Sequence, residues 1–153
     1  MNTTSEQTAA EMPDVSELLC FSIYSAGHAF NQLYRPMLDE IGLTYPQYLV
    51  MVALWSRDGR TVKELGELLF LDSSTLTPLL KRMEAGGLIT RTRNLQDERQ
   101  VLLHLTAEGT ALKQRAASVT GCIGDAIGID ADTALKIRTA IDALRDSIHK
   151  RPR

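Results

Sequence analysis

The chain has 153 residues, a length typical of one domain, with 44% hydrophobic and 24% charged residues and a net charge of −2. A chain of this size can bury a core without disulfides, and no apolar run approaches the roughly 20 residues of a membrane-spanning helix. The charge is uneven, because residues 1–56 contain one basic and six acidic residues whereas residues 71–99 contain five basic ones. This pattern fits a DNA-facing surface on an otherwise acidic protein, or charge scattered over a solvated surface.

The N-terminal segment MNTTSEQTAAEMPD has neither the basic flank nor the apolar stretch of a secretory signal. We therefore expect residues 1–13 to be a disordered tail and the protein to be cytoplasmic. A permanent disulfide between Cys20 and Cys122 is not expected in a reducing compartment.

The first predicted helix runs from about residue 15 to about residue 40. A capping box that begins with Asp14 predicts its start. Pro36 is expected to kink or divide the helix, since proline cannot donate the backbone hydrogen bond. The apolar run LCFSIYSAGHAFNQLY, residues 19–34, lies inside it and places Cys20 at about the sixth helical position.

The middle of the chain predicts three more helices: 45–56, about 62–69, and one from Ser73 or Ser74 to about 85. Thr44 and Thr61 each begin a capping box, and a glycine pair stops the third helix. Two β-type runs follow, at 88–93 and 99–105, joined by a polar loop of hairpin length. Helix, turn, helix and hairpin is the order of a winged helix-turn-helix.

The helix from Ser73 or Ser74 has two distinct faces. An apolar face recurs at helical spacing and packs the helix on its domain: Leu76, Leu79, Leu80 and Met83. The opposite face carries short hydroxyl side chains and then basic ones, which suits base edges and phosphates in the major groove. The predicted DNA-binding residues of this helix are Ser73, Ser74, Thr75, Thr77, Pro78, Lys81 and Arg82. A solvated surface helix is the alternative, but the capped helix before it and the hairpin after it favour a recognition helix.

The hairpin supplies the remaining predicted DNA-binding residues. Arg99, near the tip, is placed to enter the electronegative minor groove. Asp97 is close enough in sequence to hold the Arg99 guanidinium in a fixed direction, and Arg93 lies in the first β-type run. The alternative is a hairpin tip that mixed charge keeps soluble.

Two helices close the chain. Thr106 caps a helix from 107 to about 120, and the last helix spans about 131–149. The last helix carries an apolar stripe at spacings of three and four, formed by Ala134, Ile137, Ile141, Leu144 and Ile148. This stripe needs a partner, which is either the same chain or a second subunit.

The motif DERQVLLHLTAEG resembles the wing and exit of the MarR family of dimeric transcriptional repressors. The stretches LCFSIYSA, LTYPQYLVMVALW and LDSSTLTPLLKRMEAGGLITR resemble its organic-hydroperoxide-sensing branch, OhrR, over about residues 17–115. The resemblance implies a mainly α-helical homodimer with a small β-hairpin wing, operator DNA of pseudo-palindromic sequence as partner and organic hydroperoxides as inducers. It also implies one domain at 14–153, with a winged helix at about 45–105 and dimerisation helices at about 14–41 and 107–150.

The same resemblance makes Cys20 the redox-sensing residue and gives three tyrosines the role of thiol-activating donors: Tyr24, Tyr34 and Tyr45. Phenols stabilise a thiolate and not a thiol, and no Lys, Arg or His lies one turn from Cys20 to do so instead. Tyr24, at i+4, can reach within the helix. Tyr34 lies about 21 Å from Cys20 along a straight helix, so it can contact only Cys20 of an antiparallel partner. The alternative is an inert, buried cysteine with tyrosines that fill a core.

A redox cycle follows from these roles. The Cys20 thiolate attacks the peroxide, becomes a sulfenic acid and condenses with a thiol. Cys122 of the other subunit is the tentative resolving thiol, and a small cellular thiol is the alternative. Two rival functions are a thiol peroxidase and a MarR-type repressor that binds a small aromatic ligand reversibly, but a non-enzyme is favoured. No metal or cofactor is expected, because His28, His104 and His149 are widely separated and no ligand motif is present.

Overall fold

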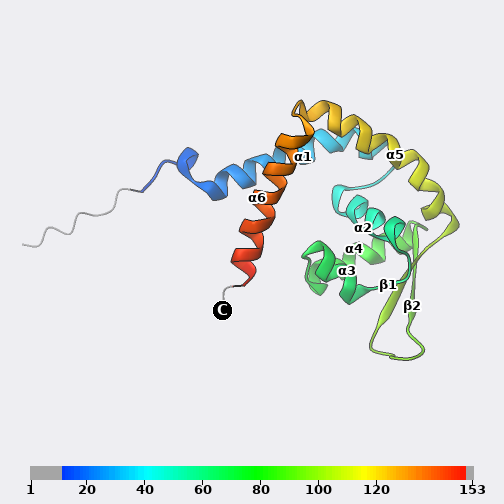
Figure 1. Ribbon diagram of the computed structural model, residues 1–153. Helices are drawn as coiled ribbons and strands as arrows, with labels where there is room; N and C mark the ends of the chain where they lie inside the picture. Colours follow the sequence, from blue (N-terminus) through cyan, green and yellow to red (C-terminus); the bar gives the residue numbers. More distant parts are fainter. Residues whose placement is uncertain (1–11, 151–153) are drawn as a thin grey trace, which may run out of the picture.

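The computed structural model describes residues 12–150, which form a mainly helical fold with one small antiparallel sheet (Figure 1). The helices are α1 Leu19–Glu40, α2 Tyr45–Ser56, α3 Val62–Leu69, α4 Ser73–Ala85, α5 Ala107–Ile127 and α6 Ala131–His149. The 3-10 turn and the strands are η1 Val15–Glu17, β1 Arg60–Thr61, β2 Ile89–Arg93 and β3 Val101–Leu105. The predicted fold class is confirmed. The predicted disordered tail falls, for residues 1–11, outside the described part of the chain.

The start of the first helix differs from the prediction. The capping box at Asp14 forms, but it closes only the short η1 turn. Leu18 then adopts an extended backbone with φ −81° and ψ 122°, so α1 begins one residue later. Cys20 is therefore the second residue of α1 and not the sixth. Pro36 lies inside α1 and does not divide it, since its missing N–H removes one of many helical hydrogen bonds.

Capping side chains delimit the helices of the winged helix-turn-helix. Thr44 and Thr61 each form the complete capping box that their spacing predicts. Asp72, which the sequence pattern did not assign, caps α4 by accepting a hydrogen bond from the Thr75 backbone N–H at 2.9 Å. A cap of this kind stabilises a helix by about 1 kcal/mol, so three local signals fix where these helices begin.

The wing has shorter strands than predicted and a third strand beside them. β2 and β3 are shorter than the expected runs at 88–93 and 99–105, because β2 begins one residue later, at Ile89, and β3 begins only at Val101, after the loop. β1 pairs with β3 and completes an antiparallel sheet of order β1-β3-β2. A strand of two residues is too short to show a period of two, so no sequence pattern predicts β1.

The core lies between the C-terminal end of α1, α2, α3, α4, the sheet and α5. The residues predicted for the inner face of α4 are all buried: Leu76, Leu79, Leu80 and Met83. They belong to one apolar cluster with Leu54 of α2, Leu65 of α3 and Leu103 of β3. Burial of this face fixes the rotation of α4 about its axis and turns the opposite face outward.

The helix after the wing is longer than predicted. α5 continues past residue 120, although Gly121 and Gly124 lie in its path. Val119 and Ile123 are buried on the same helix. Their packing outweighs the roughly 1 kcal/mol that each helical glycine costs relative to alanine, so the helix persists.

Two helices carry apolar side chains that the rest of the described chain leaves exposed. Residues 19–32 of α1 are all exposed, and Figure 1 shows this half of α1 extending away from the winged helix. α6 has no buried residue. The exposed large apolar side chains of α1 and α6 are Leu19, Phe21, Ile23, Tyr24, Phe30, Leu135, Ile137, Ile141 and Ile148. Apolar surfaces of this extent commonly mark protein–protein contacts. Within residues 12–150, no helix is long and apolar enough to span a membrane.

Candidate thiol site and nucleic-acid interface

Cys20 lies at the positive end of a helix. It is exposed at the second position of α1, and Leu18 at the N-cap gives the helix no side-chain hydrogen bond. The backbone N–H groups of a first helical turn have no helical acceptors and carry partial positive charge, which favours an anion there. Cys20 therefore lies beside the backbone N–H groups of the first helical turn, whereas the predicted sixth position would have placed it beyond them.

Tyr24 follows Cys20 by one helical turn, but its ring contacts the next turn. It meets the His28 ring edge to face, with centroids 4.5 Å apart and planes at 78°. Tyr24 is 64% exposed. Tyr24 and Cys20 thus lie on the same helix, but the ring of Tyr24 packs against His28. The role of Tyr24 as a hydrogen-bond donor to the Cys20 thiol stays a prediction.

Tyr34 and Tyr45 meet in the structure, and Tyr48 joins them in what we call the tyrosine cluster. The ring centroids of Tyr34 and Tyr45 are 4.9 Å apart, and Tyr48 lies 5.7 Å from Tyr34. Burial raises the pKa of Tyr34 and of Tyr45, and the neighbouring phenols add to the rise. These two phenols therefore keep their protons at physiological pH and stay hydrogen-bond donors. Tyr48 was not predicted, although its spacing of three from Tyr45 indicates a shared helical face.

The tyrosine cluster lies far from Cys20 of the same chain. Tyr34 and Cys20 are 14 residues apart on one helix, which is about 21 Å along its axis. A second copy of α1, if packed antiparallel, would reverse the residue order and bring its own Cys20 to Tyr34. A site that contains both the thiol and the cluster is therefore complete only with two chains.

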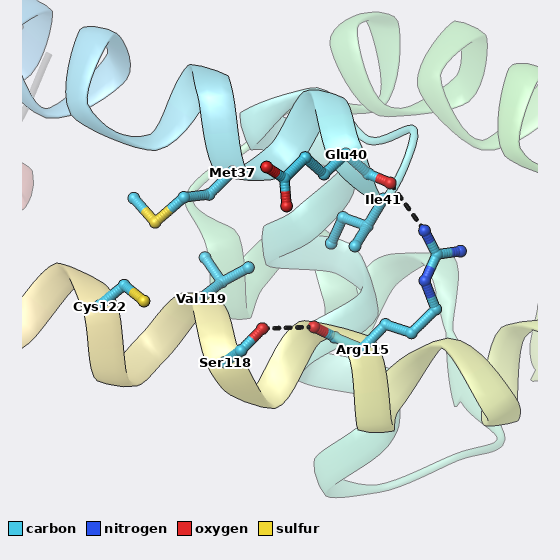
Figure 2. Close-up of a pocket in the computed structure, with 7 residues that line it drawn as sticks. All are labelled: Met37, Glu40, Ile41, Arg115, Ser118, Val119 and Cys122. Carbon is cyan, nitrogen blue, oxygen red and sulfur yellow. Dashed lines mark hydrogen bonds between the residues drawn. The ribbon is translucent and has the colours of Figure 1, made fainter.

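Cys122 lies on α5 beside the C-terminal half of α1. It lines a cavity of about 340 Å³ together with Met37 of α1, and Figure 2 shows the two side chains on opposite walls. Arg115 bridges the same two helices by donating to the Glu40 carbonyl oxygen at 2.7 Å (Figure 2). Met37 is 17 residues from Cys20, or about 25 Å along α1. Cys20 and Cys122 of one chain thus lie far beyond the roughly 4–7 Å Cα spacing of a disulfide.

The predicted recognition face of α4 is open to solvent. Thr77 is half-buried, and the other predicted residues of this face are exposed: Ser73, Ser74, Thr75, Pro78, Lys81 and Arg82. A concavity of about 1010 Å³ lies between α3, α4 and the wing, and its lining includes Ser73, Thr77, Asp97 and Arg99. The structure thus brings the predicted helix and wing residues to one surface. Arg93 is exposed at the end of β2 and does not line this concavity.

Asp97 holds the backbone of the wing. Its Oδ1 accepts a hydrogen bond from the Arg99 backbone N–H at 3.1 Å. Its carbonyl oxygen accepts one from the Gln100 N–H at 2.9 Å. The structure forms these backbone contacts instead of the predicted contact with the Arg99 guanidinium. They shape the loop, and the Arg99 side chain remains exposed at its end.

Arg91 joins the wing to α4, a role that its sequence position does not reveal. Its guanidinium donates to Glu84 at 3.1 and 3.2 Å, and its backbone N–H donates to the same carboxylate at 2.9 Å. These bonds hold the pKa of Glu84 below its usual value. Arg91 therefore holds the wing beside α4.

Replacing Arg99 with alanine is expected to weaken DNA binding by roughly tenfold and to flatten its salt dependence. One phosphate contact contributes about 0.9 to the slope of log Kd against log salt, so one contact in each protomer of a dimer contributes about 1.8. Titrating a labelled duplex at several salt concentrations measures both quantities. Arg138→Ala, on α6 and outside the concavity, removes the same charge and is the control. Equal effects of the two substitutions would contradict a wing contact.

The chain is similar to regulators of transcription. A family model described as transcriptional regulator SarA/Rot matches residues 32–116. The organic hydroperoxide resistance transcriptional regulator of Bacillus subtilis is 42% identical over 133 residues, covering 87% of this chain and 90% of that protein. Reduced AbfR bound to DNA is 33% identical with a TM-score of 0.72, covering 86% of this chain and 92% of that chain. AbfR is a protein of Staphylococcus epidermidis.

Two further solved structures extend the comparison. Disulfide-formed AbfR is 35% identical with a TM-score of 0.61, covering 82% of this chain and 88% of that chain. PcaV of Streptomyces coelicolor, in complex with its natural ligand, is 27% identical with a TM-score of 0.81, covering 90% of this chain and 98% of that chain. The matched residues 32–116 include the tyrosine cluster, α4 and the wing. The chain belongs to the MarR-type winged-helix transcriptional regulators, in the branch of the organic hydroperoxide resistance regulators.

Proposed function

We propose that this protein is a homodimeric, cytoplasmic repressor that binds a pseudo-palindromic operator and leaves it when an organic hydroperoxide oxidises Cys20. The position of Cys20 carries the proposal: it is exposed on the first turn of α1, whose other end holds Tyr34 of the tyrosine cluster. Two antiparallel copies of α1 put each thiol beside the cluster of the other chain. The 42% identity to the Bacillus regulator supports organic hydroperoxides as the oxidants.

The exposed apolar helices supply the dimer interface in this proposal. The first half of α1 and the stripe of α6 leave large side chains in solvent in one chain, and a second copy covers both without exposing new surface. Residues 14–41 and 107–150 then form the dimerisation helices around the winged helix at 45–105. The DNA-bound AbfR structure supports DNA as the partner, and we assign its contact to the outward face of α4.

Oxidation starts from the thiolate. The Cys20 sulfur attacks one peroxide oxygen, the O–O bond breaks, and the alcohol leaves after taking a proton. Sulfur loses two electrons and becomes a sulfenic acid, and the peroxide is reduced by two electrons. Tyr34 and Tyr45 of the partner subunit, kept protonated by burial, donate hydrogen bonds to the thiolate. The hydroxyl of Tyr24 has the same role from its own helix.

Cys122 of the partner subunit resolves the sulfenic acid. Its thiol attacks the Cys20 sulfur, a disulfide forms and water leaves. The cavity shared by Cys122 and Met37 lies at the C-terminal end of α1, which is the end that an antiparallel partner's Cys20 approaches. The solved structure of disulfide-formed AbfR supports a disulfide as the product. Bridging two chains shifts the recognition helices, which must match half-sites about 34 Å apart.

Replacing Cys122 with serine is expected to abolish a covalent dimer and to leave the first oxidation step intact. Hydroperoxide-treated protein should run as a linked dimer on a non-reducing gel, whereas Cys122→Ser should run as a monomer. Intact-mass measurement should still show one added oxygen, or a small-thiol adduct, on Cys20 of the variant. A linked dimer that persists in Cys122→Ser would rule out this resolving role.

Operator binding with and without an organic hydroperoxide tests the proposed function directly. The reduced protein should bind operator DNA far more tightly than random DNA. One equivalent of hydroperoxide per thiol should reduce its affinity for the operator to that for random DNA. A thiol peroxidase would instead consume many equivalents of hydroperoxide in the presence of a reductant. Sustained consumption without any change in DNA binding would contradict the repressor assignment.

A further pocket, between α2 and α5, favours an alternative function, in which a small aromatic ligand binds reversibly and releases the DNA. A cavity of about 280 Å³ between α2 and α5 is lined by Tyr48, Trp55, Lys113 and Thr120. Its aromatic walls and its lysine suit an aromatic anion. PcaV, which is similar in fold, has been solved with its natural ligand. Release of DNA by an aromatic carboxylate, in protein whose thiols are blocked, would support this function.

A further inference from the structure

The turn between α3 and α4 contains the only non-glycine residue with positive φ among residues 12–150. Phe70 ends α3 with φ 55° and ψ 38°, in the left-handed region. This conformation is unfavourable for a residue with a large side chain, and glycine or asparagine would adopt it more readily. The turn is also tight, because a Cβ at Gly66 would lie 2.8 Å from the Leu71 carbonyl oxygen. A phenylalanine at this position needs a compensating contact.

The end of α6 provides that contact. The Arg145 guanidinium lies over the Phe70 ring, 4.2 Å from its centroid, and the His149 ring lies 5.3 Å away. Carboxylates orient the arginine: Asp142 accepts from Nη1 at 2.8 Å and Asp146 from Nη2 at 3.2 Å. His149 Nδ1 lies 2.9 Å from the Arg145 carbonyl oxygen. The cation is therefore held in place by its own helix and faces the ring.

This contact connects two surfaces with different roles. Arg145 and His149 lie one turn apart, at the edge of the exposed apolar stripe of α6. Phe70 and His149 also line the concavity that contains Ser73, Thr77 and Arg99. α6 thus extends from the face assigned to the partner subunit to the rim of the DNA-reading surface, and Figure 1 shows its C-terminal end beside α3.

We propose that Arg145 and His149 are positioning residues that hold the recognition helix through Phe70, so that α6 sets the separation of the two recognition helices in the dimer. The effect on affinity for operator DNA follows from the contact itself. The further consequence, that oxidation at the dimer interface reaches α4 by this route, rests on the proposed function.

Operator titrations with matched variants test the positioning role. Phe70→Asn removes the ring and keeps a residue suited to the left-handed turn, and Arg145→Gln removes the cation. Each should raise the operator Kd of the reduced protein by about three- to tenfold, while the Kd for random DNA changes less than about twofold. The double variant should match either single variant, and Arg145→Lys should restore binding to within about twofold. Arg138→Gln, the same charge change two turns earlier on α6, should have no effect.

Three results would overturn this role. The effects of Phe70→Asn and Arg145→Gln could multiply, which would show that the residues act independently. Binding to random DNA could weaken in parallel, which would make Arg145 a direct phosphate contact. Arg138→Gln could weaken operator binding as much as Arg145→Gln, which would assign the effect to charge alone.

A separate measurement tests the transmission of oxidation. The ratio of operator Kd in oxidised and reduced protein should fall at least fivefold in Phe70→Asn and Arg145→Gln, with Cys20 oxidised to the same extent by mass. An unchanged ratio would overturn the transmission. If the unsubstituted protein keeps its operator after oxidation, the proposed function fails, whereas the titrations of reduced protein still decide the positioning role.

Discussion

Replacing Cys20 with serine is expected to leave operator binding intact and to abolish its loss on treatment with an organic hydroperoxide. Serine has a similar size, and its hydroxyl can hydrogen-bond to the phenols that the proposed dimer places beside it. In the unsubstituted protein, oxidation should raise the operator Kd by about 100-fold or more, because specific binding exceeds non-specific binding by roughly 10³ or more. In the Cys20→Ser variant the change should be less than about twofold.

Fluorescence anisotropy of a labelled operator, before and after one equivalent of cumene hydroperoxide per thiol, measures both values. Cys122→Ser is the matched control, since it keeps Cys20 and should still lose some affinity on oxidation. Full release from the Cys20→Ser variant would refute the sensor assignment. Release of that variant by an aromatic carboxylate would favour the pocket between α2 and α5 as the regulatory site.

Replacing Gly109 with alanine is expected to destabilise the fold by about 3 kcal/mol or more. Gly109 lies in the first turn of α5, and a Cβ there would overlap the Leu88 carbonyl oxygen and approach Met51 Cε to 3.4 Å. That carbonyl oxygen cannot move freely, because it accepts hydrogen bonds from the Thr106 N–H and hydroxyl, both at 3.1 Å. The Trp55 indole N–H also donates to the Gly109 carbonyl oxygen at 2.9 Å. The substitution must therefore separate α5 from the start of the wing.

Thermal unfolding at matched protein concentration measures this effect, and the midpoint should fall by roughly 6–12 °C. Gly121→Ala is the control on the same helix. A Cβ at Gly121 meets nothing within 4 Å in one chain, so this change should stabilise α5 by up to about 1 kcal/mol. An unfolding midpoint for Gly109→Ala equal to that of the unsubstituted protein would show that the approach of α5 to Leu88 is not tight.

Local signals in the sequence predicted the starts of α2 and α3 and the inner face of α4 correctly. The capping boxes at Thr44 and Thr61 connect residues three apart, and the apolar face of α4 repeats within two turns. The prediction from the capping box at Asp14 was wrong, because this box caps only a 3-10 turn and α1 begins separately, after Leu18. A cap specifies where a helical turn begins, but it does not specify how far the helix continues.

The roles of Cys20 and of the three tyrosines, which the family resemblance implies, stay predictions. The structure adds that Tyr34 meets Tyr45. The sequence did not reveal that Cys20 occupies the first turn of α1, or that Tyr48 completes the tyrosine cluster. At the wing, the proximity of Asp97 to Arg99 was correct but the contact was with the backbone N–H. A short carboxylate two residues away reaches the backbone more easily than the end of a long side chain.

The helix starts at Thr44 and Thr61, the order of helices and wing, and the outward face of α4 are readable from the amino-acid sequence, because these features depend on interactions within one or two helical turns. Three contacts emerge only when the chain is folded: Arg91 joins the wing to Glu84, Cys122 lies at the far end of α1 from Cys20, and the end of α6 meets Phe70. Such contacts join residues distant in sequence. They depend on how buried faces pack together, which no local pattern encodes.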